Sequence, residues 1–304
     1  MNYPAKVQLT EVGMRDGFQM ETLILPTEKK IEIGLALIDA GLTRIEATSF
    51  VSPKNVPQLA DAAAVVAGLK GRGAALNALV PNSNGARRAA AAGIDRMTVF
   101  VSASEAHNAR NVRRTIAESL VGLAEISAVA SDAGVSLCGA VATSFGCPYE
   151  GDVPATAVLR VVEAMVEMGV EEIYLGDTTG MATPPIVETL VTQLRKRLPG
   201  TPLGLHFHNT RGLGLVNVMK GLELGIDRFE SSIGGLGGCP FAVGATGNVC
   251  SEDLVYLLDE LGIASGVNLS RLIGVARSVQ AVFGRDLPGQ LLKSGPRLVS
   301  AAKR

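Results

Sequence analysis

Hydrophobic runs and amphipathic stretches alternate along this chain in one repeating pattern. A stretch with helical spacing of apolar residues ends at a Gly, and a run of β-branched and other apolar residues follows within a few positions. The pattern is clear at five glycines and looser at two more: Gly41, Gly93, Gly134, Gly169 and Gly225, then Gly71 and Gly200. Gly favours the left-handed C-cap of a helix, and β-branched residues favour strands. The pattern therefore predicts seven helix-to-strand junctions.

These junctions, with a first strand near residues 7–12, predict eight strands separated by helices. The helices are expected at residues 27–40, 57–70, 83–92, 112–133, 154–168, 184–198, 213–224 and 252–261. Near-continuous apolar strands that alternate with helices form parallel sheets. Eight such units predict an α/β protein with one closed (β/α)8 TIM barrel. An open doubly wound sheet is the alternative, but no G-x-G-x-x-G motif stands at a first strand–helix turn.

The domain organisation follows from the same pattern. A length of 304 residues fits two domains of about 150 residues or one large barrel. No break in composition marks a second domain, so residues 1–304 are expected to form a single catalytic domain. The barrel is expected over about 7–262, and a C-terminal helical addition over about 268–304.

Composition excludes several classes of protein. Hydrophobic residues make up 47% of the chain, which rules out a disordered protein. The net charge of −1 and the absence of Trp argue against a nucleic-acid partner and against an anionic membrane surface. No apolar run is long enough to span a membrane. The N-terminus shows no leader sequence, the C-terminal AAKR is no peroxisomal signal, and the four Cys form no C-x-x-C pair. We therefore expect a cytoplasmic location.

Polar residues cluster where the predicted strands end, and barrel active sites lie at the C-terminal ends of strands. These residues are Glu11, Arg15 and Asp16 at the first strand, Glu46, Thr48 and Ser49 at the second, Asp177 at the sixth, His206 and His208 at the seventh, and Cys239 and Asn248 after the eighth. One rim of the barrel is therefore expected to hold the chemistry.

The His-x-His pair is the strongest candidate for a metal site. His206 and His208 stand two apart on a predicted strand and so face the same side. Asp16 and Asn248 can complete the site with oxygen ligands, and such a donor set suits Mg²⁺, Mn²⁺, Co²⁺ or Zn²⁺. The alternative is a pair of core histidines hydrogen-bonded to their neighbours.

Three charged residues are candidates for supporting roles. Arg15 can stabilise a developing oxyanion, and it can also form an ion pair with Glu46, since a carboxylate within a strand needs a partner. Both roles are compatible. Asp177 is expected to orient a histidine or an arginine of the site.

Cys239 is the candidate catalytic thiol. It lies in the Gly-rich segment GGLGGCPFAVGATGN, which permits a mobile lid. Among the other cysteines, Cys138 is expected in the core, Cys147 in a loop and Cys250 in a structural position. His107 and the arginines 110, 113 and 114 are expected to form a solvated face, with phosphate binding as the alternative.

These residues carry a resemblance to a known family. The segments EVGMRDGFQME, IEATSFVSPKNVPQLAD, CPYEG, GDTTG, HFHNT and GGLGGCPFAVGATGNVCSEDLVYLL together resemble 3-hydroxy-3-methylglutaryl-CoA (HMG-CoA) lyases. This family belongs to a superfamily of metal-dependent lyases and Claisen-type synthases built on TIM barrels. The resemblance implies four metal ligands: Asp16, His206, His208 and Asn248. It also implies Arg15 at the substrate, Cys239 as the catalytic thiol, and a homodimer.

The implied reaction is a retro-Claisen cleavage of an acyl-CoA, HMG-CoA, to acetyl-CoA and acetoacetate, as in leucine degradation. It would use a divalent cation, with Mg²⁺ or Mn²⁺ expected first. The resemblance leaves the base open: His206 is a candidate, and Glu46 or Asp177 could relay the proton. The alternatives are a lyase for a related thioester of the citramalyl type, a condensing 2-alkylmalate synthase and a non-catalytic binding barrel.

Several residues depart from the lyase pattern. Met14, Phe18 and Met20 replace the usual Pro, Leu and Asn of the first motif, and Asn209 and Arg211 stand where Asp and Tyr are common. Phe18 and Met20 lie just beyond Asp16, in the first strand-to-helix loop, so both are expected near the acyl end of the substrate.

Overall fold

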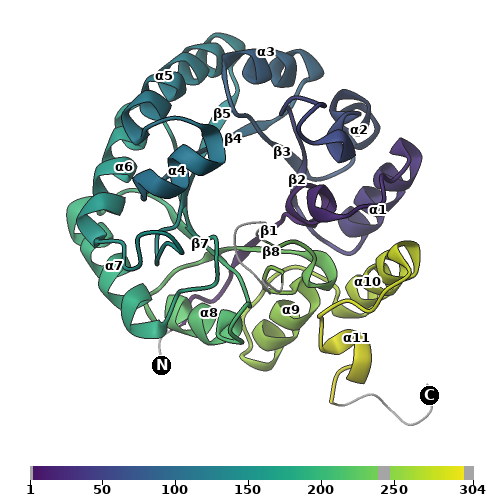
Figure 1. Ribbon diagram of the computed structural model, residues 1–304. Helices are drawn as coiled ribbons and strands as arrows, with labels where there is room; N and C mark the ends of the chain where they lie inside the picture. The colour runs from purple at the N-terminus through teal and green to yellow at the C-terminus, as the bar shows by residue number, and fades with distance from the viewer. Residues whose placement is uncertain (1–2, 239–246, 298–304) are drawn as a thin grey trace, which may run out of the picture.

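The computed structural model describes residues 3–238 and 247–297 and contains a closed barrel of eight parallel strands in chain order (Figure 1). The strands are β1 (Gln8–Glu11), β2 (Arg44–Ser49), β3 (Ala75–Leu79), β4 (Arg96–Ser102), β5 (Ser136–Ala142), β6 (Glu172–Asp177), β7 (Leu203–Phe207) and β8 (Arg228–Ser231). β1 closes the barrel on β8, with Gln8 opposite Arg228 and Glu11 opposite Ser231. The predicted TIM barrel is confirmed, and the open sheet is excluded.

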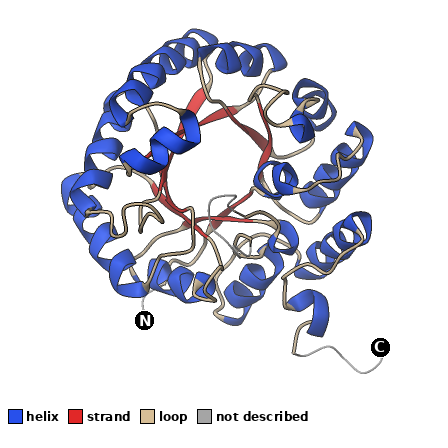
Figure 2. Ribbon diagram, viewed as in Figure 1, coloured by secondary structure: helices blue, strands red, loops and turns tan. Residues whose placement is uncertain are grey.

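Helices form a ring around the strands (Figure 2). They are α1 (Thr27–Asp39), α2 (Ala62–Leu69), α3 (Ser83–Ala92), α4 (Glu105–Val112), α5 (Ile116–Ala133), α6 (Ala155–Glu167), α7 (Pro184–Arg197), α8 (Gly214–Glu223), α9 (Ser251–Glu260), α10 (Leu269–Phe283) and α11 (Leu291–Ser294). Gly93 and Gly134 end α3 and α5 with φ of 77° and 64°, as their C-cap pattern predicts. None of the described helices has the length and apolar character that a membrane span requires.

The helix expected over 112–133 corresponds to α5, which begins at Ile116, and the structure adds a separate helix, α4, that the sequence interpretation missed. Ser104 caps α4 by accepting a hydrogen bond from the His107 amide, and Arg113 ends that helix in a left-handed conformation with φ of 58°. Thr115 and Glu118 then form a capping box that starts α5. The two caps are visible in the sequence, but the polar composition of α4 hides its helical period.

The C-terminal helices lie outside the ring, beside α1 and α9 (Figure 1). α10 buries Leu272, Ala276 and Val279 against the barrel. The ring of Phe283, at its end, meets Phe18 edge-on at a centroid distance of 5.7 Å. This addition therefore supports the segment that follows β1.

A layer of charged side chains fills the N-terminal end of the barrel. It consists of the first residues of the even-numbered strands: Arg44, Arg96, Glu172 and Arg228. The Glu172 carboxylate forms ion pairs with the guanidinium groups of Arg44 at 2.7 Å, Arg96 at 2.8 Å and Arg228 at 2.8 Å. Such layers of four from alternate strands are typical of TIM barrels. Here one buried carboxylate pairs with three guanidinium groups.

We expect Glu172→Gln to lower the free energy of unfolding by about 3–5 kcal/mol, because removing one partner leaves buried charge uncompensated. The matched control is Glu163→Gln, whose partner Arg197 is 69% exposed, and the expected loss there is below about 1 kcal/mol. Denaturant midpoints of both variants measure the difference. Equal losses would show that the layer is not a buried ion cluster.

Candidate metal centre and active site

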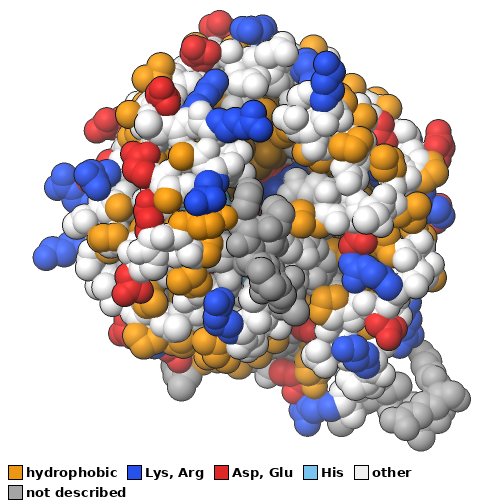
Figure 3. Space-filling view, in the orientation of Figure 1, with side chains coloured by type: hydrophobic (Ala, Val, Ile, Leu, Met, Phe, Trp, Pro, Cys, Tyr) orange, Lys and Arg blue, Asp and Glu red, His pale blue; other side chains and the backbone are white. Residues whose placement is uncertain are grey.

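A cavity of about 800 Å³ opens among the C-terminal ends of the strands. Arg15, Asp16, His206, His208 and Glu230 all line it. Figure 3 shows a hollow near the centre of this face of the molecule. The polar residues predicted at strand ends therefore meet at one rim, as barrel geometry requires.

Asp16 reaches this cavity on a π-helical turn, Gly13–Gly17, directly after β1. The Asp16 amide donates to the Val12 carbonyl at 2.7 Å, which fixes the turn. A Cβ atom on Gly17 would lie 2.7 Å from Cβ of Leu236, whose carbonyl accepts the Asn248 side chain at 3.0 Å. Gly at position 17 therefore lets two site-bearing segments pack closely.

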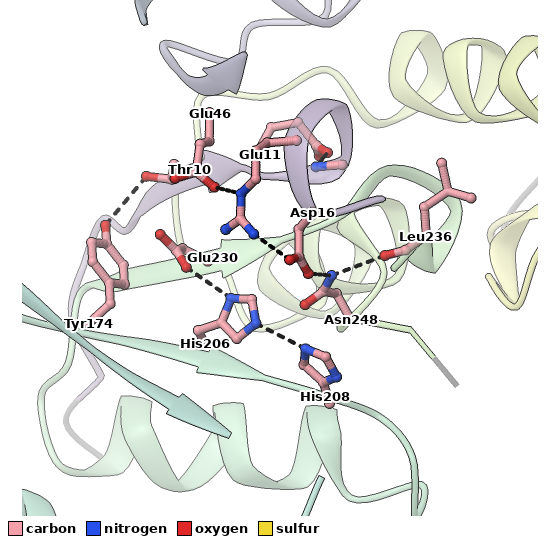
Figure 4. A network of polar contacts seen from close by, with 12 residues as sticks. Thr10, Glu11, Asp16, Glu46, Tyr174, His206, His208, Glu230, Leu236 and Asn248 are labelled. Atoms are coloured by element: carbon pink, nitrogen blue, oxygen red, sulfur yellow. Dashed lines mark hydrogen bonds and ion pairs between the residues drawn. The ribbon is translucent and has the colours of Figure 1, made fainter. Parts of the chain in front are cut away.

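The four predicted metal ligands come together (Figure 4). Asp16, His206 and His208 each place one donor atom within 4.8 Å of the others. The Nε2 atoms of the two histidines are 3.1 Å apart, as expected for residues on the same side of one strand. Asn248 joins them by donating from Nδ2 to Asp16 Oδ2 at 2.8 Å.

The chemistry of these donors fits a divalent cation. Burial, followed by the charge of His206, lowers the pKa of His208 to about 3, so its imidazole is neutral. Burial alone would raise the pKa of Asp16, but Arg15 and both histidines hold it below its usual value. Asn248 Oδ1 is buried and has no hydrogen-bond partner among the described residues. Imidazole nitrogens, a carboxylate and a free amide oxygen are ligands that divalent metals take.

Glu230 is a site residue that the sequence interpretation missed. Its Oε2 lies 2.9 Å from His206 Nδ1. Burial lowers the pKa of His206, but the hydrogen bond and the charge of Glu230 outweigh it, and the net shift is upward. A carboxylate in this position fixes the ring orientation and leaves Nε2 facing the cavity. The available signal was a glutamate inside the strand RFES, which needs a partner as Glu46 does.

Arg15 links the candidate metal ligands to Glu46. Its Nε donates to Glu46 Oε2 and its Nη1 to Asp16 Oδ1, both at 2.5 Å. The expected ion pair with Glu46 is confirmed. Gln19, also missed in the sequence, donates to the same Asp16 oxygen at 3.0 Å. Arg15 and Gln19 thus orient one carboxylate oxygen of Asp16, while Asn248 orients the other.

Asp177 does not enter this network. Asp177 ends β6, and its Oδ1 accepts the amides of Met181 and Ala182 at 2.7 and 3.0 Å. It makes no hydrogen bond to a histidine or an arginine within the described segments, although burial raises its pKa to about 6 and its charge interacts with His206 and Arg211. Its closest partners are therefore the backbone of its own loop. Cys239 lies outside the described residues.

Three of the cysteines are described, and each is a buried free thiol. Cys138 lies in β5 and Cys147 in the loop after it, as expected. The Cys147 sulfur accepts the Ser104 hydroxyl at 3.0 Å. Cys250 stands just before α9, where a structural role was predicted.

The expectation of a solvated face is confirmed for the three arginines and is wrong for His107. Arg110, Arg113 and Arg114 are exposed and line the cavity, but His107 is only 1% exposed. Its Nδ1 lies 3.0 Å from the Ser102 hydroxyl at the end of β4. The separate helix α4 turns His107 inward, and burial lowers its pKa.

The residues that depart from the lyase pattern separate into two groups. Met20 lines the cavity, as expected, but Phe18 is buried against Phe283 and does not. Placing Phe18 at the acyl end was therefore wrong. Asn209 Oδ1 accepts the Gly214 amide at 3.0 Å, and Arg211 donates to the Thr179 and Gly180 carbonyls. Both residues order loops beside the site.

Another buried carboxylate, Glu11, joins three segments of the chain near the candidate metal ligands. It accepts the amides of Gly13 and Ile233 at 2.7 and 2.9 Å and the hydroxyl of Ser251. Burial raises its pKa from 4.5 to about 7. Glu11 thereby connects the turn that carries Asp16 with the end of β8 and the start of α9.

We expect the raised pKa of Glu11 to make stability fall as the pH rises. The folded state holds a proton that the unfolded chain releases above pH 4.5, so this stabilisation is complete below pH 4.5 and is lost as the pH approaches 7. A shift of this size corresponds to about 3 kcal/mol. Glu11→Gln mimics the protonated form, so its urea midpoints should change less than the wild-type midpoints between pH 5 and 8. Parallel profiles would contradict the assignment.

Comparisons with known proteins agree with this geometry. The HMGL-like family model matches residues 6–279. The chain is 44% identical to the hydroxymethylglutaryl-CoA lyase YngG of Bacillus subtilis, over 96% of this chain and 98% of that protein. It is also 44% identical to the mitochondrial hydroxymethylglutaryl-CoA lyase of Mus musculus, over 97% and 91% of the two chains.

Solved structures give the same result. An HMG-CoA lyase from Acinetobacter baumannii, crystallised with coenzyme A and 3-methylmalate, superposes with a TM-score of 0.93 at 42% identity and covers 99% of this chain and 98% of its own. The hydroxymethylglutaryl-CoA lyase of Pseudomonas aeruginosa superposes with a TM-score of 0.94 at 41% identity, over 97% and 98%. The chain therefore belongs to the HMGL-like family, together with these hydroxymethylglutaryl-CoA lyases.

Proposed function

We propose that this protein is a metal-dependent lyase that cleaves HMG-CoA to acetyl-CoA and acetoacetate. The observation that carries the proposal is the meeting of Asp16, His206 and His208 with Arg15 in one cavity, with Asn248 hydrogen-bonded to Asp16. The names of the relatives support the choice of substrate.

Asp16, His206, His208 and Asn248 would hold the cation, and Mg²⁺ or Mn²⁺ is the ion proposed. Bound there, it would supply Lewis-acid chemistry that lowers the pKa of the substrate's tertiary hydroxyl. The chain supports this site from behind, because Glu230 orients His206 while Arg15 and Gln19 orient Asp16.

The protein's own groups would then move the protons. His206 would act as the base through Nε2, since Glu230 occupies Nδ1. Glu46 is tied to Arg15, and Asp177 to backbone amides, which makes both weaker candidates. Once the hydroxyl proton is lost, its oxygen forms the carbonyl of acetoacetate at C3 while the C2–C3 bond breaks. The electron pair of that bond forms the enolate of acetyl-CoA. Arg15 stabilises the enolate oxygen, and the Cys239 thiol protonates the carbon.

Arg15→Met is expected to lower kcat by about 10²–10³-fold, the usual loss when one oxyanion donor is removed. The single change also leaves Glu46 buried without its partner, so stability should fall as well. The double variant Arg15→Met, Glu46→Gln separates the two effects. It should recover stability without recovering kcat. Recovery of both would make Arg15 structural only.

A panel of CoA thioesters distinguishes the proposal from its alternatives. With Mg²⁺ or Mn²⁺, HMG-CoA should be cleaved with a higher kcat/KM than a citramalyl-type thioester. A 2-alkylmalate synthase would instead release free CoA thiol from acetyl-CoA and a 2-keto acid. A binding barrel would show neither reaction. If the citramalyl-type thioester had the higher kcat/KM, the proposed substrate would change, and the proposed retro-Claisen chemistry would stay the same.

Three further properties belong to the proposal. We propose one catalytic domain, a homodimer and a cytoplasmic location. The buried free thiols of Cys138, Cys147 and Cys250 fit a reducing compartment.

A further inference from the structure

A second layer of side chains from the even-numbered strands lies on the cavity side of the charged layer, and two of its members line the cavity. Each member of this second layer stands two residues further along its strand than a member of the charged layer. The second layer consists of Glu46, Thr98, Tyr174 and Glu230, which follow Arg44, Arg96, Glu172 and Arg228 in that order. Tyr174 and Glu230 line the same cavity as the metal cluster. Tyr174 is by far the largest member of this second layer, so it determines how deep the cavity is.

The sequence leaves space for the Tyr174 ring. Its neighbour on β7 is Gly204, and its neighbour on β5 is Ala140. A Cβ atom on Gly204 would lie 2.3 Å from the ring. The Tyr174 hydroxyl extends toward β1, where it lies 3.3 Å from the Thr10 hydroxyl (Figure 4). Tyr174 is only 1% exposed and packs closely on Gly204, so its ring acts as a fixed wall.

The charges around this wall decide which part of the substrate can face it. Two carboxylates belong to this second layer, Glu46 and Glu230, and both are already paired, with Arg15 and with His206. Burial raises the pKa of Tyr174 well above 10, so its hydroxyl stays neutral. A carboxylate arm of the substrate is therefore disfavoured at this wall and favoured near Arg15. An apolar substituent meets no such penalty.

We propose that Tyr174 sets the size of the substituent at C3 of the acyl group, admitting methyl and excluding longer alkyl chains. The inference rests on the proposed function, because it assumes a 3-hydroxy-3-alkyl acyl-CoA in this cavity. It assigns Tyr174 a role in specificity: the ring contacts the alkyl substituent and makes no contact with the bonds that change.

The test compares HMG-CoA with its 3-ethyl homologue. One methylene is typically worth about 10–200-fold, so the wild type should prefer HMG-CoA by at least about tenfold in kcat/KM. Tyr174→Ala should reduce this preference to below about threefold. Tyr174→Phe keeps the ring and should retain the tenfold preference. Tyr174→Leu, a smaller change in volume, opens the cavity if the Ala variant does not fold. Tyr256→Ala on α9, outside the cavity, is the matched control and should keep the wild-type ratio.

Binding supplies a readout independent of turnover. The glutaryl thioesters that lack the hydroxyl, 3-methylglutaryl-CoA and 3-ethylglutaryl-CoA, cannot be cleaved by this chemistry, and calorimetry should give the same order of affinities. A folded Tyr174→Ala or Tyr174→Leu protein whose ratios stay within twofold of wild type would overturn the proposal. The proposal would also be overturned if these variants gained activity only toward thioesters with a longer carboxylate arm, because that arm, and not the C3 alkyl group, would then face Tyr174. A wild type that binds with this preference but does not cleave HMG-CoA would refute the proposed function alone.

Discussion

Removal of divalent metal by a chelator is expected to lower kcat for HMG-CoA by at least about 10⁴-fold, and Mg²⁺ or Mn²⁺ should restore it. The reason is that Lewis-acid stabilisation contributes several kcal/mol, at about 1.36 kcal/mol for each tenfold in rate. His208→Ala should reproduce the loss and weaken metal affinity, since His208 supplies one of three donors within 4.8 Å of one another.

The third histidine of the chain provides the matched control. His107 lines the same cavity but binds Ser102 and stands outside the metal cluster. His107→Gln should therefore keep the metal affinity measured by competition with a chromophoric chelator. Full activity of metal-stripped protein, or equal loss of affinity in the two variants, would contradict the assignment of the site.

Cys239→Ser is expected to lower kcat by about 10²–10⁴-fold while substrate and metal binding stay nearly intact. This is the usual contribution of a general acid, and a thiol with an ordinary pKa of about 8.5 carries its proton at neutral pH. Single-turnover kinetics together with calorimetry of metal and substrate separate the loss in chemistry from a loss in binding.

Alkylation checks the same thiol by a different route. Cys138, Cys147 and Cys250 are at most 7% exposed, and burial raises the pKa of Cys138 and Cys250. Buried thiols with raised pKa react slowly. Iodoacetamide should therefore inactivate the wild type through Cys239, and bound substrate should protect it. If Cys239→Ser retains measurable activity and loses it at the wild-type rate, the sensitive thiol lies elsewhere.

The barrel and the meeting of Asp16 with His206 and His208 could be predicted because both follow from local rules. Helix C-caps at Gly93 and Gly134 mark the repeat, and a repeat of strand and helix leads to one topology. Strand ends then place Asp16 and the His206–His208 pair on one rim without any knowledge of side-chain packing.

The features that were missed depend on contacts between distant parts of the chain. Phe18 packs on Phe283, 265 residues away, and no local pattern announces that contact. Glu230 is placed beside His206 by the pairing of β7 with β8. The sequence shows that a carboxylate within a strand needs a partner, but only the closed barrel determines which one it meets.

The most direct test of the central claim is a product analysis with purified protein, HMG-CoA and Mn²⁺. We predict acetyl-CoA and acetoacetate in equal amounts, and, in D₂O, one deuterium in the acetyl methyl group, because a solvent-exchanged thiol protonates the enolate. The His208→Ala protein should give neither product. Release of free CoA without acetoacetate, or no conversion by the metal-loaded wild type, would contradict the claim that this site carries out a retro-Claisen cleavage.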